Sequence, residues 1–316
     1  SAASDVYKRQ AKDYLIIIAA GNIFSTGFSS LIRAEGRMVY SLMIWLVPTA
    51  FNIFADYVFI FLLSMGVRGA ALATVGSQFI SFLMSIIFFT KISCQSFKKA
   101  KPHLNTIREI IALGVPVLLQ MGGMSVIFLV VNNCLSRLLT SDWVSAFAYV
   151  GKIATFFIIP FNALIQASSP IISYNFGAKN LSRISKTLRC CFVTLYVYSA
   201  VAVLIIELVS PQLMSIFTKS DTVVSIGAGA LNIISLSAAF LPPILIFGAY
   251  FQAIGDKKKS VLINALLISV LSVCIVFVSL LDCKRIWLSI PLGCFVVLLP
   301  TIVIFKKNGI SHSSFT

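Results

Sequence analysis

Long apolar runs restrict the fold of this chain more than any other feature of its sequence. Stretches of eighteen or more predominantly apolar residues recur from one end to the other. As a helix, about twenty residues cross the hydrocarbon core of a bilayer. Hydrophobic residues make up 59% and charged residues 11% of the chain, against about a half and a quarter in soluble domains. The sequence therefore predicts an all-α polytopic membrane protein and excludes a soluble domain.

We expect nine spans, at residues 14–32, 39–63, 67–90, 107–135, 144–174, 187–209, 223–252, 260–281 and 287–305. Eight of the ten prolines fall inside these spans, including the adjacent pair Pro242 and Pro243. Each proline removes a backbone donor, so a neighbouring helix or water must satisfy the freed carbonyl. The prolines therefore predict bent helices around a cavity, although they also fit ordinary membrane-helix composition.

The positive charge follows the loops rather than one face of the chain. Of the lysines and arginines near the expected spans, sixteen fall in one set of alternate loops and five in the other. The positive-inside rule explains this bias, so the net charge of +15 does not indicate a nucleic-acid partner. It predicts a cytoplasmic carboxyl terminus. With nine spans the chain would start outside, and we expect an odd number of spans to precede it.

Two similar segments of the sequence suggest a duplicated unit. The segment FSSLIRAEG at 28–36 closes the first expected span, and GAYFQAIG at 248–255 closes the seventh. Each is followed by a basic loop and two further spans, as in parallel repeats. Two six-span halves would make twelve spans, so we expect three to be missing before the first. The first ten residues resemble a sequencing scar.

These observations predict the organisation of the chain. We expect a non-native segment at 1–10, the remainder of an N-terminal lobe with three helices at 11–90, and a cytoplasmic inter-lobe loop at 91–106. A C-terminal lobe of six helices would cover 107–305, followed by a cytoplasmic tail at 306–316. The seven cysteines and the two histidines show no disulfide framework and no metal-ligand spacing. No motif indicates an enzyme.

A carboxylate inside the second expected span is the strongest candidate for a functional site. Asp56 would cost several kcal/mol there unless it is solvated or paired. Asn52 lies one turn before it on the same face. Thr74, in the next span, is expected at a depth similar to that of Asp56. Three oxygen-bearing side chains so placed predict a site for a hard cation or a proton. A cluster of hydrogen bonds that joins two helices explains the same spacing equally well.

Six motifs give the sequence a family resemblance. They are LIRAEG at 31–36, the Asn52-x-x-x-Asp56 pair, GVRGAALAT at 66–74, LGVPVLLQ at 113–120, PIISYNFGAK at 170–179 and YFQAIG at 250–255. Together they resemble the multidrug and toxic compound extrusion (MATE) transporters, closest to their DinF/MepA-like branch. In family terms the nine spans resemble helices four to twelve, so helices one to three would be missing from this chain.

The resemblance implies a two-lobed secondary antiporter with parallel six-helix repeats. Such a protein exports organic cations or amphipathic drugs across the cytoplasmic membrane, driven by influx of Na⁺ or H⁺. The resemblance assigns cation coupling to Asn52, Asp56 and Thr74, and it adds an Asp from the absent helix one. It implies a monomer with no cofactor besides the coupling ion. Other branches of the MATE family carry acidic residues within the helices of the C-terminal lobe.

Other polar residues inside the spans are weaker candidates for a substrate cavity. They lie in the fourth and fifth expected spans, and each also fits an interhelical hydrogen bond: Gln120, Asn132, Tyr149, Asn162 and Gln166. Lys152 would face the cavity or extend towards an interface. Two alternatives stay open. A flippase for lipid-linked saccharides shares the architecture but would need basic residues in the cavity, and a truncated fragment or membrane scaffold would not transport.

Overall fold

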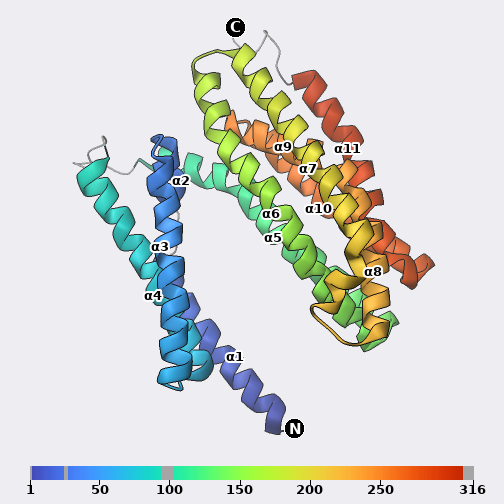
Figure 1. The fold of residues 1–316 in the computed structure, drawn as a ribbon. Helices are drawn as coiled ribbons and strands as arrows, with labels where there is room; N and C mark the ends of the chain where they lie inside the picture. The colour runs from blue at the N-terminus through green and yellow to red at the C-terminus, as the bar shows by residue number, and fades with distance from the viewer. Residues whose placement is uncertain (1, 25–27, 94–102, 309–316) are drawn as a thin grey trace. The chain divides into compact units, whose positions relative to one another are not determined.

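The computed structural model is helical and describes residues 2–24, 28–93 and 103–308. The side chains it describes exclude those of residues 2–9, 23, 120, 121, 138 and 308. Eight helices in the described part of the chain are long and apolar enough to cross a membrane. The chain divides into two compact units, Ser1–Lys101 and Pro102–Thr316 (Figure 1). The all-α membrane architecture expected from the sequence is confirmed.

The first unit is built on one antiparallel helix pair. Its elements are α1 (Ala2–Gly21), the short 3₁₀ helix η1 (Asn22–Phe24), α2 (Phe28–Ala34), α3 (Met38–Asp56) and α4 (Gly66–Ile87). The π-helices η2 (Tyr57–Leu62) and η3 (Phe88–Ile92) continue α3 and α4. Figure 1 shows α3 and α4 side by side. The first expected span, 14–32, is divided among α1, η1 and α2, which is why eight long helices are found rather than nine.

The second unit contains the remaining helices. They are α5 (Leu104–Leu138), α6 (Ser141–Gly177), α7 (Leu181–Ser215), α8 (Asp221–Ser235), η4 (Leu236–Ala239), α9 (Leu241–Ala253), α10 (Lys257–Leu281), η5 (Cys283–Leu288) and α11 (Ser289–Asn308). The seventh expected span is broken at η4, directly before the two prolines at the start of α9. This break is the bend that Pro242 and Pro243 predicted.

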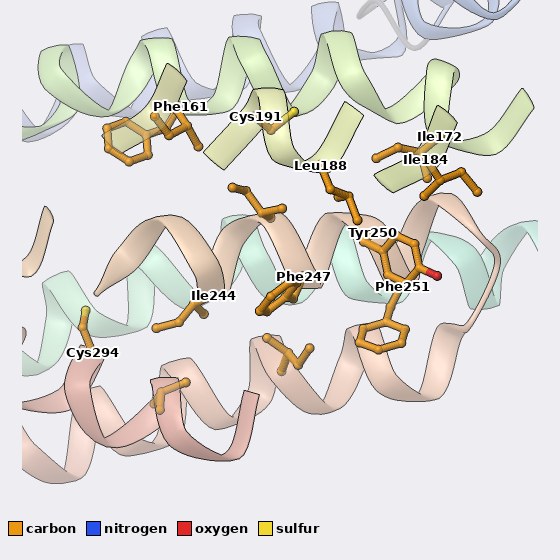
Figure 2. Packing of buried hydrophobic residues seen from close by; sticks show 14 of the residues in the cluster. Phe161, Ile172, Ile184, Leu188, Cys191, Ile244, Phe247, Tyr250, Phe251 and Cys294 are labelled. Atoms are coloured by element: carbon orange, nitrogen blue, oxygen red, sulfur yellow. The ribbon is translucent and has the colours of Figure 1, made fainter. Parts of the chain in front are cut away.

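Large apolar side chains fill the interior of the second unit. Phe161 of α6, Leu188 of α7 and Phe247 of α9 belong to one buried cluster, shown in Figure 2. Phe251 of α9 and Ile263 of α10 extend this cluster and are fully buried. Without a hydrophobic driving force between helices in lipid, close packing of this kind is what holds the bundle together.

Side chains from neighbouring helices bond to backbone carbonyls at both bends. Pro48 removes the helical donor for the carbonyl of Ile44, and Ser81 of α4 donates to that oxygen at 3.1 Å. At the second bend the Tyr196 hydroxyl donates to the carbonyl of Ala239, the last residue of η4, at 3.4 Å. Both bonds connect different helices. The bends are therefore stabilised by specific interhelical contacts.

Two glycine turns show that the chain contains a repeat. Gly36 follows α2 with φ +79°, and Gly255 follows α9 with φ +81°. In both turns the glycine N–H donates to the carbonyl three residues earlier, and the next N–H donates to the carbonyl five residues before it. These bonds close a helix with a left-handed residue, a conformation in which glycine is favoured. The two glycines differ by 219 in residue number (36 and 255).

The same numbering difference relates two interhelical bonds beside these turns. Ser41 at the start of α3 donates through Oγ to the carbonyl of Ser29 at 3.2 Å. Ser260 at the start of α10 donates to the carbonyl of Gly248, also at 3.2 Å. Numbers 41 and 260, and 29 and 248, again differ by 219. The segment from α2 to α3 is therefore equivalent to the segment from α9 to α10, in agreement with the similarity of their sequences. For the next helices, α4 and α11, the buried faces match at a difference of 220: Gly69, Ala73, Ser77 and Ser81 against Ser289, Gly293, Val297 and Thr301.

Candidate functional site

Asn52 and Asp56 lie one turn apart on α3, and both are half-buried. Nδ2 of Asn52 and Oδ1 of Asp56 are inaccessible to solvent and have no hydrogen-bond partner among the described residues. A buried polar atom without a partner costs about 1–3 kcal/mol. Asp56 is also the last residue of α3 before the π-helical turn η2, and such turns are frequent at functional sites. The pair therefore offers unsatisfied bonding capacity.

The hydroxyl of Thr74 on α4 already uses its proton in a hydrogen bond. Its Oγ1 donates to the carbonyl of Ala70, one turn earlier in the same helix, at 3.0 Å. A hydroxyl has one proton and two lone pairs. With the proton committed, Thr74 can offer only lone pairs to a further partner. Such an oxygen suits a cation rather than a hydrogen-bond acceptor.

Two contacts fix the register of α3 against α4. A Cβ added at Gly69 would lie 3.0 Å from the backbone of Phe59. Further along the pair, Ser81 bonds to Ile44. Interpolation between these contacts along two antiparallel helices places Thr74 opposite residue 53.

The register changes one expectation from the sequence. Thr74 is level with the interval between Asn52 and Asp56, about 4.5 Å deeper along the axis than Asp56. The expected equal depth of Asp56 and Thr74 is therefore wrong by most of a turn, because the turn between the helices is asymmetric. The three side chains still fall within about one helical turn of one another along the pair.

Gln78 is a further polar residue at this place, and the sequence reasoning missed it. It lies one turn beyond Thr74 on the same face of α4. Its Oε1 is buried and without a partner in the described structure, like the atoms of Asn52 and Asp56. The i, i+4 spacing from Thr74 was the available signal in the sequence, but glutamine in a membrane helix is more often an ordinary interhelical donor.

The repeat shows that the fold does not require polar residues here. At the numbering difference of 219, Asn52 is equivalent to Leu271 and Asp56 to Ile275, and at the difference of 220 that relates α4 to α11, Thr74 is equivalent to Cys294. Leu271 is 7% exposed and Ile275 is fully buried. The same helix pair therefore packs with apolar residues in the second unit.

The cavity candidates of the second unit lie on α5 and α6. Asn132 is exposed on α5, and the side chain of Gln120 lies outside the described residues. On α6 the Tyr149 ring stacks on Phe217 at 5.7 Å between centroids. The other two, Asn162 and Gln166, are one turn apart on one face of α6.

Lys152 approaches an aromatic ring near the end of a helix. Its Nζ lies 5.8 Å from the centroid of Phe217, two residues beyond the end of α7. A cation over an aromatic face is stabilised by the ring quadrupole. Of the two expectations for Lys152, extension towards an interface agrees with this contact.

The donor set of the first unit is that of a hard-cation or proton site. Among the described residues, no group of three or more His, Cys, Asp or Glu side chains is arranged to hold a metal ion. The cluster on α3 and α4 combines one carboxylate with neutral oxygens, which are the ligands that hard cations prefer.

Comparison with known proteins identifies the family. The sequence model of the MatE family matches residues 116–278, which is more than half of the chain. The chain belongs to the MatE family. The multidrug export protein MepA of Staphylococcus haemolyticus (strain JCSC1435) is 28% identical over 229 residues. MepA of Staphylococcus aureus (strain N315) is 27% identical over 251 residues. The resemblance stated from the motifs is confirmed.

The chain spans about half the length of these curated relatives. The alignments cover 72% and 76% of this chain but 50% and 54% of the two MepA proteins. A solved outward-facing MATE family transporter of the MOP superfamily has a TM-score of 0.88 at 20% identity, over 96% of this chain and 70% of that one. A MOP superfamily transporter from Pyrococcus furiosus Vc1 gives a TM-score of 0.86, with the same identity and coverage. These structures establish the fold.

Proposed function

We propose that this chain forms part of a secondary antiporter that exports organic cations or amphipathic drugs. Influx of Na⁺ or H⁺ drives the export, and the ion binds at Asn52, Asp56 and Thr74. The multidrug export names of the related MepA proteins support the substrate class. The charge bias of the loops supports a cytoplasmic membrane location with a cytoplasmic carboxyl terminus. The protein acts as a monomer.

One observation carries the coupling site. The helix pair α3–α4 holds buried polar atoms without partners at positions where its repeat, α10–α11, has packed apolar residues. Unsatisfied groups reduce stability, and Leu271 and Ile275 show that the counterparts of Asn52 and Asp56 pack without polar groups. Such a cost is retained where the groups have a function, and a bound cation would supply the missing partner.

The proposed mechanism follows from the donors. A carboxylate inside a membrane protein binds either a proton or a metal cation, so the two ions compete for Asp56. Binding changes the relative stability of two arrangements of the bent helices by the difference in ion affinity between them. Export of a drug and entry of the ion are thereby linked.

Efflux from cells tests this proposal. The complete reading frame that contains this sequence is expressed in an efflux-deficient host, and ethidium extrusion is measured under imposed Na⁺ and H⁺ gradients. Asp56→Asn should abolish the dependence on either gradient. Asp13→Asn is the matched control, because Asp13 is also a carboxylate of the first unit but is paired with Arg68 at 2.7 Å. Unchanged gradient dependence in Asp56→Asn would refute the coupling role, and no extrusion of ethidium or other cations would refute the exporter.

A further inference from the structure

Gln78 is the member of the polar cluster that the proposed function leaves without a role. By the register of the pair it lies opposite residue 48, about 6 Å beyond Asn52 on the side away from Asp56. Helical side chains lean towards the N-terminus of their own helix. Gln78 on α4 therefore leans back towards Asn52, and Asn52 on the antiparallel α3 leans towards Gln78. Both side chains therefore bring an unsatisfied buried atom to the same level of the helix pair.

The chemistry of this amide distinguishes the two candidate ions. A proton needs one basic oxygen, which Asp56 supplies. A metal cation needs several oxygens to replace its water shell. The amide oxygen of Gln78 does not take up a proton in the physiological range, and Thr74 offers only lone pairs. Both neutral oxygens therefore stabilise a bound metal cation and contribute little to a bound proton.

The repeat excludes a packing role that any membrane helix pair would need. At the numbering difference of 220 that matches the buried faces of α4 and α11, the equivalent of Gln78 is Leu298, which packs against the apolar core of the second unit. An apolar side chain therefore serves at this point of the same helix pair. The polar group of Gln78 is specific to the unit that also contains Asp56.

We propose that Gln78 is a specificity-determining ligand that makes the site on α3 and α4 prefer Na⁺ over H⁺. This inference rests on the proposed coupling at Asp56. In the ion-bound state Oε1 of Gln78 coordinates Na⁺ from the side opposite Asp56, with Thr74 between them. The buried oxygen then acquires the partner that it lacks in the described structure.

Ion-dependent stability of the purified protein tests this assignment. A ligand that binds the folded state raises its melting temperature in a concentration-dependent way. The melting temperature of the full chain in detergent is measured against Na⁺ concentration at alkaline pH, which gives the Na⁺ response. It is then measured against pH in the absence of Na⁺, which gives the proton response. Gln78→Met keeps the length and removes the amide. It should raise the Na⁺ concentration for half-maximal stabilisation about tenfold and leave the proton response unchanged.

Two further variants distinguish a failure of the role of Gln78 from a failure of the coupling at Asp56. Gln212→Met makes the same substitution at an exposed position near the end of α7 and should leave both responses as in the parent. Asp56→Asn should abolish both responses. If Gln78→Met shifts the Na⁺ and proton responses equally, or shifts neither, or if the parent responds only to protons, the role of Gln78 is refuted while coupling at Asp56 stands. If Asp56→Asn retains both responses, the proposed coupling itself fails.

Discussion

Ser81 on α4 donates a hydrogen bond to the one carbonyl of α3 that Pro48 deprives of its helical donor, that of Ile44. Ser81 and Ile44 are both buried, so water does not replace this bond. The contact joins the two helices of the candidate site and fixes their register.

Removing this bond should destabilise the first unit. Ser81→Ala leaves the Ile44 carbonyl without a partner, and we expect a loss of about 1–2 kcal/mol in the free energy of unfolding. Pro48→Ala restores the helical donor and should offset most of that loss in the double variant. Denaturant titration of the four proteins in detergent gives the coupling energy. Ser85→Ala is the control, because Ser85 bonds within its own helix. Additive effects of the two substitutions would contradict this account of the bend.

The turn glycines should resist substitution. Gly36→Ala and Gly255→Ala place a side chain at φ +79° and +81°, which costs about 1–2 kcal/mol for residues other than glycine. Thermal unfolding should show a lower melting temperature for both. Gly114→Ala should instead be neutral or stabilising, because Gly114 is within α5 and no atom lies within 4 Å of its added Cβ. Equal effects at all three positions would argue against a role of the left-handed conformation.

The close approach of α10 and α11 should also be sensitive. Gly293→Ala brings a Cβ to 2.6 Å from Leu271 Cδ2, and overpacking of this kind typically costs about 1–3 kcal/mol. Gly229→Ala has open space around the new Cβ and should not reduce stability by more than a few tenths of a kcal/mol. Resistance to thermal aggregation reports the difference. A tolerant Gly293 would show that Leu271 moves aside freely.

Replacing the carboxylate by its repeat counterpart should separate stability from function. Asp56→Ile introduces the residue type of Ile275, which is fully buried in the second unit. Removing a buried atom without a partner should raise the free energy of unfolding by about 1–2 kcal/mol. The same variant should lose the stabilisation by Na⁺ and the gradient-driven efflux. A less stable Asp56→Ile protein would mean that Asp56 has partners in the folded state that the structure does not reveal.

Periodicity and composition were sufficient for the helices, because spans near twenty residues are set by bilayer thickness. The break before Leu241 also followed from local chemistry, since Pro242 and Pro243 cannot continue a hydrogen-bonded helix. The first expected span was less predictable. Its division into α1, η1 and α2 depends on contacts with α4, and tertiary contacts override a continuous apolar pattern.

The candidate site was only partly predictable. The four-residue spacing of Asn52 and Asp56 sufficed to place them on one face, because both lie on one helix. The depth of Thr74 and the involvement of Gln78 depend on the register between two helices. That register is set by Ser81 and by the close approach at Gly69, neither of which is visible as a periodic signal.

The protein contains two copies of one helix pair, so each copy can be compared with the other. A duplicated gene segment starts with identical halves, and one half can acquire buried charge while the other preserves the fold. Here Asn52 and Asp56 are polar where their counterparts 219 residues later, Leu271 and Ile275, are apolar and buried. Comparing one half with the other therefore locates a specialised position without reference to any second protein.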